Sequence, residues 1–240
     1  MLVVVPAHNE AGSIADVVAR IQAVDLACLV VDDGSTDGTG AIARAAGAQA
    51  VCLPINLGVG GALRTGFRYA VAHGFDGVVQ CDGDGQHPPE RIHELIDAGE
   101  GADIVIGSRF VAGAESFEIG RARRLAMRWL SWLLKVRSGL TVADTTSGFR
   151  YIGQPLLGEF AREFPTHYLG DTFEALLVAG RAGYRVAEVP TRIDARPIGS
   201  STANTAAAVK YVLRSTVVAG LGLTFRVRPR PADGGRLPAA

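Results

Sequence analysis

The sequence has few cysteines and no excess of charge of either sign. Only three of its 240 residues are cysteine, and an odd number cannot pair completely. Cys28, Cys52 and Cys81 each lie in a short apolar run that predicts a buried strand. We therefore expect free thiols and a reducing cytosol. The 24 basic and 24 acidic residues cancel, so the overall charge gives no attraction to nucleic acid.

Long apolar runs are also absent. No stretch reaches the roughly 20 apolar residues that a membrane-spanning helix needs. The first strand-like run begins at Leu2 with no basic leader before it, so we expect no secretory signal and a soluble or peripheral protein. Its 48% hydrophobic and 20% charged residues are typical of one folded domain with a large core. No internal repeat is present.

Strand-like and helix-like patterns alternate along the first half of the chain. Strands are predicted over residues 2–5, 28–32, 49–53, 77–81 and 103–107. Helices are predicted over 12–23, 37–47, 60–73 and 88–98. This alternation predicts an α/β fold with a doubly wound, mainly parallel, Rossmann-like sheet and helices on both faces. Ligands of such sheets bind at the carboxyl ends of the strands, so the loops that follow the strands are the expected site.

The pattern changes after about residue 110. A Gly-containing loop is followed by a basic helix, a polar segment, a second helix and a strand, predicted over 121–137, 141–151, 171–182 and 185–193. We expect a catalytic domain over 1–202, an apolar or amphipathic helix over 203–227 and a flexible, basic, Pro-rich tail over 228–240. The helix has four possible contacts: anionic lipid, a separate small membrane protein, a second copy of the chain, or its own core.

Two carboxylates, Asp82 and Asp84, stand two residues apart where a predicted buried strand ends. In extended backbone they point to the same side. An isolated Asp-Gly-Asp is more often a solvated turn than a site. Two adjacent anions repel unless a cation neutralises them, and such oxygen ligands suit Mg²⁺ or Mn²⁺ with a diphosphate completing the shell.

A second acidic loop, residues 31–37, follows the second predicted strand. Ser35 to Asp37 can cap the next helix, but capping leaves the Asp32-Asp33 pair unexplained. Carboxylates there can accept hydrogen bonds from base N–H groups or ribose hydroxyls, which would hold a nucleoside at the edge of the sheet. The loop after the first strand, residues 6–10, adds polar groups beside it.

Three segments together resemble family-2 glycosyltransferases: Pro6–Glu10, Val31–Asp37 and Asp82–Pro88 match in residues, order and spacing. The resemblance is closest to the dolichol-phosphate mannosyltransferase and polyprenyl-phosphate glycosyltransferase branch, and it covers about residues 2–200. It implies the GT-A fold and an inverting transfer of a sugar from a UDP- or GDP-sugar donor. It also implies a divalent metal, Mg²⁺ or Mn²⁺.

The resemblance assigns residues to the donor side. The implied metal ligands are Asp82, Asp84 and Gln86, with Asp82 and Asp84 at the catalytic centre. The implied donor-binding residues are Pro6, His8, Glu10, Asp33, Asn56, Gly58, Arg64, Asp82 and Arg196. Residues 56–66 resemble the family's Gly-rich segment, although many relatives have lysine in place of Val59. A plain structural helix start is the alternative interpretation of these glycines.

Arginines mark the acceptor side. Arg109 follows the fifth predicted strand, and Asp144–Arg150 resembles a segment of the same branch that includes Ser147. Guanidinium groups match phosphate oxygens, so Arg109 and Arg150 favour a phosphorylated acceptor. We expect Arg109 to be both a catalytic and an acceptor-binding residue. We expect Arg121 and Arg124, with Ser147 and Arg150, to bind the acceptor too.

The helix over 121–137 is basic and amphipathic. Four of its cations, Arg121, Arg124, Arg128 and Lys135, share a face beside an apolar stripe of Leu125, Trp129, Trp132 and Val136. Tryptophans favour membrane interfaces, so one interpretation is that the helix guides a polyprenyl phosphate in the bilayer surface. The other is an ordinary surface helix whose tryptophans enter the core.

We therefore expect an inverting glycosyltransferase that is peripheral at the inner, cytosolic face of the membrane, with a nucleotide-sugar donor and a lipid-phosphate acceptor. A separate small membrane protein or a homo-oligomer is a further possible partner. One alternative is a family-2 enzyme with a hydroxyl acceptor, in which Asp171 serves as general base rather than as a helix N-cap. Another is a non-catalytic nucleotide-binding module. The absence of an Arg- and Lys-containing phosphate loop near residues 5–15 disfavours a nucleotidyltransferase.

Overall fold

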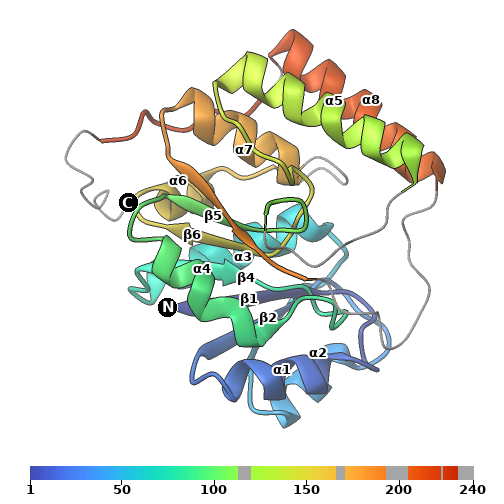
Figure 1. Ribbon diagram of the computed structural model, residues 1–240. Coiled ribbons are helices and arrows are strands. Elements are labelled where there is room, and N and C mark those ends of the chain that lie inside the picture. Colours follow the sequence, from blue (N-terminus) through green and yellow to red (C-terminus); the bar gives the residue numbers. More distant parts are fainter. Residues whose placement is uncertain (113–119, 166–170, 193–204, 223, 232–240) are drawn as a thin grey trace.

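The computed structural model describes residues 1–112, 120–165, 171–192, 205–222 and 224–231 (Figure 1). One seven-stranded sheet has the order β3-β2-β1-β4-β6-β5-β7. Its strands are β1 (Leu2–Ala7), β2 (Ala27–Asp32), β3 (Gln49–Cys52), β4 (Gly77–Gln80), β5 (Ile104–Ser108), β6 (Arg150–Gly153) and β7 (Val186–Pro190). β6 is antiparallel to β4 and β5, and the other pairs are parallel. This mainly parallel sheet confirms the predicted fold class.

Helices cover both faces of the sheet. They are α1 (Ile14–Gln22), α2 (Thr39–Ala45), α3 (Val59–Ala72), α4 (Ile92–Ala98), α5 (Arg121–Ser138), α6 (Leu156–Arg162), α7 (Asp171–Arg181) and α8 (Thr205–Leu221), with a short 3₁₀ turn at Pro89–Arg91. One apolar cluster joins the sheet to α1, α2 and α4, and the other joins it to α3, α5, α6 and α7. Figure 1 shows α5 and α8 at the outer edge of the second layer.

β1 is apolar at every position because both of its faces are covered. Val3 and Val5 of β1 point into the first cluster, whereas Leu2 and Val4 point into the second. All four are fully or nearly fully buried. α3 lies so close to β1 that Gly66 has no room for a side chain against Val4. β2 and β4 both pair with β1 in parallel, so the carboxyl ends of the three strands lie side by side.

Two elements were not predicted, β6 and α6. β6 has four residues and lies at the end of a segment that reads as polar, so its sequence carries no clear period-2 signal. It inserts between β4 and β5, and this places residues 143–149 beside the end of β4. The antiparallel insertion therefore matters for the site.

The cysteines are free, but they do not all lie in buried strands. Cys28 and Cys81 are buried, and burial raises the pKa of the Cys28 thiol to about 12. The prediction was wrong for Cys52, which is exposed because β3 is the edge strand and Cys52 is its last residue.

The chain after α8 returns to the core. Phe225 packs against Phe160 and Phe164, with ring centroids 6.1 and 6.2 Å apart. Arg230 Nε donates to Asp103 Oδ2 at 2.8 Å. The part of the expected flexible tail from residue 232 onward lies outside the described residues. No helix in the described part of the chain combines the length and the apolar character needed to cross a bilayer.

Candidate active site

The loops after β1 and β2 are joined into one unit. His8 Nδ1 donates to the carbonyl of Asp33 at 2.9 Å, which leaves His8 Nε2 to accept from the Asn9 amide. The Asn9 N–H donates to Ser35 Oγ at 2.9 Å, and the Asn9 side-chain oxygen accepts from the Thr36 N–H at 2.9 Å. His8 is exposed at this edge of the sheet. Two segments that are 25 residues apart in the chain thus form one polar surface.

The carboxylates of Asp32 and Asp33 hold different segments of the chain. The Asp32 carboxylate accepts from the N–H groups of Ser35 and Gly40 at 2.9 and 3.1 Å, so it holds the start of α2. The Asp33 carboxylate accepts from the N–H groups of Leu57 and Gly58 at 2.7 and 2.8 Å. Asp33 is 3% exposed, so these bonds fix the Gly-rich segment beside β2.

The Gly-rich segment needs glycine for conformational reasons. Gly58 has φ +83°, and its N–H also donates to Asn56 Oδ1 at 2.9 Å. Gly34 has φ +68°, and a Cβ there would lie 2.7 Å from the carbonyl carbon of Ile55. The two loops can therefore approach each other closely. Asn56 is exposed beside them.

Arg64, predicted on the donor side, turns toward α6. Its guanidinium donates to the carbonyl of Arg162. It lines a hollow of about 460 Å³ together with Glu159 and the C-terminal segment at Arg226 and Arg228. The structure thus places Arg64 against α6 and the C-terminal segment rather than among the acidic loops.

Asp82, Asp84 and Gln86 follow β4 and alternate in burial with their neighbours. The three are half-buried, whereas the residues between them are buried. Asp84 Oδ1 accepts from the Gln86 N–H at 3.0 Å, and Gly85 between them has φ +78°. The predicted ligands therefore share an accessible side of the loop.

His87 and Ser13, which sequence reasoning did not select, hold this loop. The Asp82 N–H donates to His87 Nδ1 at 3.0 Å, so Nδ1 carries no proton, and His87 Nε2 lies 3.6 Å from Asp82 Oδ2. His87 is 5% exposed, while the Asp82 side chain is 39% exposed. Ser13 Oγ donates to the Gly83 carbonyl at 2.7 Å. His87 thus holds the backbone of Asp82, while the Asp82 carboxylate stays partly exposed.

The donor set fits a divalent metal that also binds a substrate phosphate. The loop offers two carboxylates and one amide, which are hard oxygen ligands. Within the described ranges, no three His, Cys, Asp or Glu side chains gather closely enough to hold a metal by themselves. A Mg²⁺ or Mn²⁺ ion here would therefore need further oxygens, and a diphosphate supplies them.

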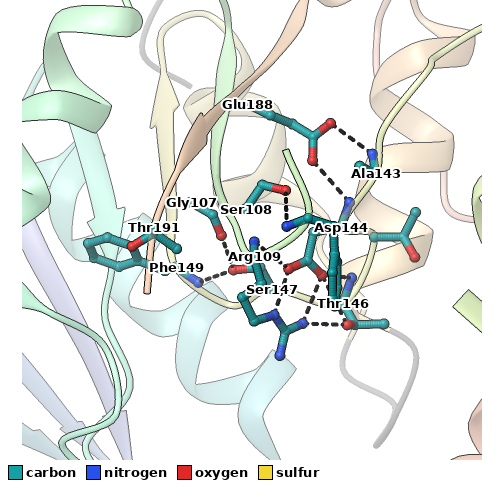
Figure 2. Close-up of polar contacts among 12 residues, drawn as sticks. Gly107, Ser108, Arg109, Ala143, Asp144, Thr146, Ser147, Phe149, Glu188 and Thr191 are labelled. Atoms are coloured by element: carbon teal, nitrogen blue, oxygen red, sulfur yellow. Dashed lines mark hydrogen bonds and ion pairs between the residues drawn. The ribbon is translucent and has the colours of Figure 1, made fainter. Parts of the chain in front are cut away.

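A buried ion pair fixes the segment before β6 (Figure 2). Arg109 Nε and Nη2 donate to the two oxygens of Asp144 at 2.7 and 2.8 Å, and Nη2 also donates to Thr146 Oγ1 at 2.8 Å. The Asp144 side chain is fully buried, and the Arg109 side chain is 8% exposed. Burial alone would raise the pKa of Asp144, but the hydrogen bonds and charge of Arg109 outweigh it and lower that pKa.

Glu188 of β7 anchors the same segment, although its sequence context gave no functional signal. Its carboxylate accepts from the N–H groups of Ala143 and Asp144 at 2.7 and 2.9 Å (Figure 2). Ser147 Oγ donates to the carbonyl of Gly107 on β5 at 2.7 Å. The segment is thus tied to β5 and β7 as well as to β6.

Arg150 and Ser147 are buried and form hydrogen bonds inside the protein, so neither side chain faces the solvent. Arg150 is 3% exposed, and its guanidinium donates to the carbonyls of Ser147, Thr172 and Thr145 at 2.6, 2.9 and 3.4 Å. Ser147 is 2% exposed. With Arg109, these predicted acceptor residues hold the shape of the segment, because their polar groups are used inside it.

The segment and the acidic loop meet at Gly148 and Asp82. A Cβ built on Gly148 would lie 3.2 and 3.3 Å from the two Asp82 carboxylate oxygens and 3.0 Å from Gln80 Nε2. The acceptor-side segment predicted from sequence therefore lies directly over the predicted metal ligand. Arg121 and Arg124 are exposed at the start of α5. Arg196 and the side chain of Asp171 lie outside the described part of the chain.

Comparison with known proteins gives a family and close relatives. Residues 2–158 match the family described as Glycosyl transferase family 2. The chain is 31% identical to the undecaprenyl-phosphate mannosyltransferase of Micrococcus luteus, over 84% of this chain and 86% of that protein. It is 30% identical to the polyprenol monophosphomannose synthase of Mycolicibacterium smegmatis, over 83% of this chain and 79% of that protein.

Solved structures give the same fold. Glucosyl-3-phosphoglycerate synthase of Mycobacterium tuberculosis, in complex with phosphoglyceric acid, superposes with a TM-score of 0.70 at 25% identity, over 91% of this chain and 79% of that one. The same enzyme in complex with Mn²⁺, UDP-glucose and phosphoglyceric acid gives a TM-score of 0.65 at 25% identity, with the same shares covered. The GT-A fold expected from the sequence is confirmed.

The family match includes every loop of the acidic site and the segment that lies over it. It spans β1 to β6, and so contains Asp33, Asp82, Asp84 and Gly148. The resemblance to the polyprenyl-phosphate branch is also confirmed, because two relatives named for that chemistry are 30% identical or more over most of their length. The chain is a glycosyltransferase and belongs to glycosyl transferase family 2.

Proposed function

We propose that the protein transfers a sugar, with inversion, from a UDP- or GDP-sugar to a polyprenyl phosphate at the cytosolic membrane face. The observation that carries this proposal is the position of Gly148 over Asp82, because we assign the segment of Gly148 to the acceptor side and the Asp82 carboxylate to the donor side. The two relatives named for undecaprenyl phosphate and polyprenol support the choice of acceptor. We assign the catalytic unit to residues 1–202.

Asp82, Asp84 and Gln86 would hold Mg²⁺ or Mn²⁺ together with the donor diphosphate. The bound ion offsets negative charge on the nucleoside diphosphate as it leaves. A related enzyme that contains Mn²⁺ and UDP-glucose supports this assignment. His87 keeps Asp82 oriented through two contacts of its ring. The exposed face formed by His8 and the loop after β2 would receive the nucleoside.

The acceptor side needs orientation more than proton removal. A phosphate acceptor is already anionic near neutral pH, so no strong general base is required. Arg121 and Arg124 are exposed at the start of α5, where they would attract it. Arg109 acts indirectly in this proposal, since its pair with Asp144 fixes the segment that carries Gly148.

Gly148→Ala tests the contact between the two sides. The added methyl must displace the Gln80 amide and the Asp82 carboxylate by a few tenths of an ångström, since Gln80 Nε2 lies 3.0 Å away and the two Asp82 oxygens lie 3.2 and 3.3 Å away. We expect kcat/KM to fall about tenfold or more, because small misplacements at a reacting centre are costly. Gly101→Ala is the matched control, as its nearest neighbour lies 3.9 Å away. Equal kcat/KM values for both variants would contradict the proposed role of this contact in transfer.

Asp171→Asn separates a phosphate acceptor from a hydroxyl acceptor. Loss of a general base would lower kcat by about 10²–10⁴. With a phosphate acceptor, we expect the variant to keep its kcat within a few-fold, since no base is needed. Steady-state rates with polyprenyl phosphate measure this. A rate loss of general-base size would favour the hydroxyl alternative.

The proposed function itself is tested by direct transfer. Radiolabelled UDP-glucose and GDP-mannose are offered with polyprenyl phosphate, with the corresponding polyprenol, or with a free glycan, and with either metal or chelator. We expect a metal-dependent product only with polyprenyl phosphate and one of the two donors. Product formed on polyprenol or on the glycan alone would contradict the assigned acceptor.

A further inference from the structure

α5 and α8 form a paired-helix layer at one side of the molecule. They lie side by side in Figure 1, and α7 packs beneath both. Trp129 Nε1 donates to Thr216 Oγ1 at 3.0 Å, and Arg137 donates to the carbonyl of Gly220 at 3.3 Å. The pairing joins two helices that are about 80 residues apart in the chain, which sequence analysis treated separately.

Each helix has an inner and an outer apolar face. On α5, Leu130, Leu133 and Leu134 are buried against the core. The outer stripe consists of Leu125 (71% exposed), Trp129 (41%), Trp132 (53%) and Val136 (61%). The alternative in which the tryptophans enter the core is therefore wrong, because the inner face is already filled by leucines.

α8 repeats this arrangement. Ser215 and Ala219 are buried against the layer beneath, so packing onto the protein's own core accounts for only one face. The other face carries side chains every four residues: Val209 (54% exposed), Leu213 (62%), Val217 (52%) and Leu221 (71%). Among the described residues, the eight side chains of both stripes are most of the exposed large hydrophobics, and the other two, Ile55 and Leu57, lie in one loop.

The charged residues of α5 and α8 all have one sign. The sequence of α5, RARRLAMRWLSWLLKVRS, contains five arginines and one lysine and no acidic residue. The sequence of α8, TAAAVKYVLRSTVVAGL, contains one lysine and one arginine and no acidic residue, and the arginine, Arg214, pairs with Glu174 of α7 at 3.9 Å. Apolar stripes on two helices whose own charged residues are all cations match the surface of a bilayer with anionic lipids, where methylene groups lie beneath negative headgroups.

We infer that the α5–α8 surface, defined by the eight outer apolar side chains and the cations of both helices, docks flat on an anionic bilayer. The inference rests on the proposed function, because it brings the enzyme to a membrane-borne acceptor. A second copy of the chain is disfavoured as the occupant. A symmetric dimer through this surface would place two sets of cations against each other with no acidic partner on either helix.

The chain provides its own reporter for this surface. It contains only two tryptophans, and both lie in the outer stripe. We expect the protein to float with vesicles of phosphatidylcholine and phosphatidylglycerol, and its tryptophan emission to shift to shorter wavelength as the indoles leave water. With phosphatidylcholine alone, or at high salt, binding should weaken strongly, since the headgroup attraction is screened.

Matched double variants test the apolar part. Val136→Glu with Leu213→Glu places one carboxylate on each helix, and we expect vesicle affinity to fall about tenfold or more. Ala19→Glu with Ala41→Glu makes the same change in charge at exposed positions of α1 and α2, and should bind as the wild type does. Arg128→Gln with Lys210→Gln tests the charge, with an expected loss of about tenfold. Circular dichroism and thermal unfolding confirm that each variant is folded.

Each other outcome contradicts the docking surface. It is overturned if the wild type binds neither vesicle, or if the Val136/Leu213 and Ala19/Ala41 variants bind equally. Sedimentation that shows a dimer abolished by the Val136/Leu213 variant, without vesicle binding, would assign the surface to a second copy. Transfer to detergent-solubilised polyprenyl phosphate is measured in parallel. A wild type that docks on vesicles but never glycosylates that acceptor would overturn the proposed function and leave the surface in place.

Discussion

Asp84→Ala should abolish sugar transfer and metal-dependent binding of the donor nucleotide together. Asp84 lies on the accessible side of the loop after β4 with Asp82 and Gln86, and the described residues provide no cluster of three metal-binding side chains in its place. Loss of one carboxylate therefore removes a major part of the charge that neutralises the cation. We expect a rate loss of about three orders of magnitude or more, typical of removing charge stabilisation from a transition state.

Calorimetry and kinetics measure this effect on the same preparations. UDP and GDP are titrated with Mn²⁺, with Mg²⁺ and with chelator into the wild type and Asp84→Ala, and the transfer rate is determined for each. Asp16→Ala is the control, because its side chain is 71% exposed and its contact with Arg20 is 4.0 Å long. If Asp84→Ala bound nucleotide and metal as the wild type does, Asp84 would lose its assigned role.

Asp144→Ala should be among the most destabilising single changes in the chain. It leaves the buried guanidinium of Arg109 without its counter-ion and without the two oxygens 2.7 and 2.8 Å away. Removing one partner of a buried pair costs about 3–5 kcal/mol of unfolding free energy. Urea unfolding of the wild type and the variant measures this. Because the pair fixes the segment over Asp82, any folded fraction should also have a lower kcat/KM.

A double replacement separates charge from packing. Arg109→Met with Asp144→Leu leaves no uncompensated buried charge, and we expect it to be more stable than either single variant. It should still lose activity, because Thr146 and the backbone of the segment lose their anchors. Additive effects of the two single changes would contradict a direct energetic coupling between the residues.

The ion pair also gives the unfolding free energy a pH dependence with a definite sign. The pKa of Asp144 in the folded protein lies below the value near 3.9 expected in the unfolded chain, since Arg109 favours the carboxylate. Its contribution is therefore complete above that unfolded value. It is lost progressively as the pH falls through the folded pKa. Unfolding curves at decreasing pH should show this loss in the wild type and not in Arg109→Met with Asp144→Leu.

The prediction from sequence was best where local patterns carry the information. The apolar runs that became β1, β2 and β4 contribute side chains to both buried clusters, so successive residues within each run are apolar. The acidic loops follow these strands, and parallel strands bring their carboxyl ends to one edge. This is why the loops at His8, Asp33 and Asp82 could be placed together in advance.

The prediction from sequence was weakest where the partner of a side chain is distant in the sequence. Arg109 and Arg150 were predicted as acceptor ligands because arginine suits phosphate, and Ser147 because of the resemblance. In the structure the polar groups of all three bind inside the protein. Glu188 and His87 carried no signal, since their roles depend on the backbone N–H groups that they face. Burial and hydrogen-bond partners follow from the packing of several elements, and no local pattern specifies them.

The sequence by itself determined the family, the sheet with its acidic edge, and the amphipathic character of α5. These properties depend on residue type and on short spacings, which the chain carries in any conformation. Only the tertiary structure decided that β6 inserts antiparallel beside β4, and so sets Gly148 over Asp82. It also decided that the outer faces of α5 and α8 adjoin. Both depend on contacts between segments far apart in the chain, which form only when the core is packed.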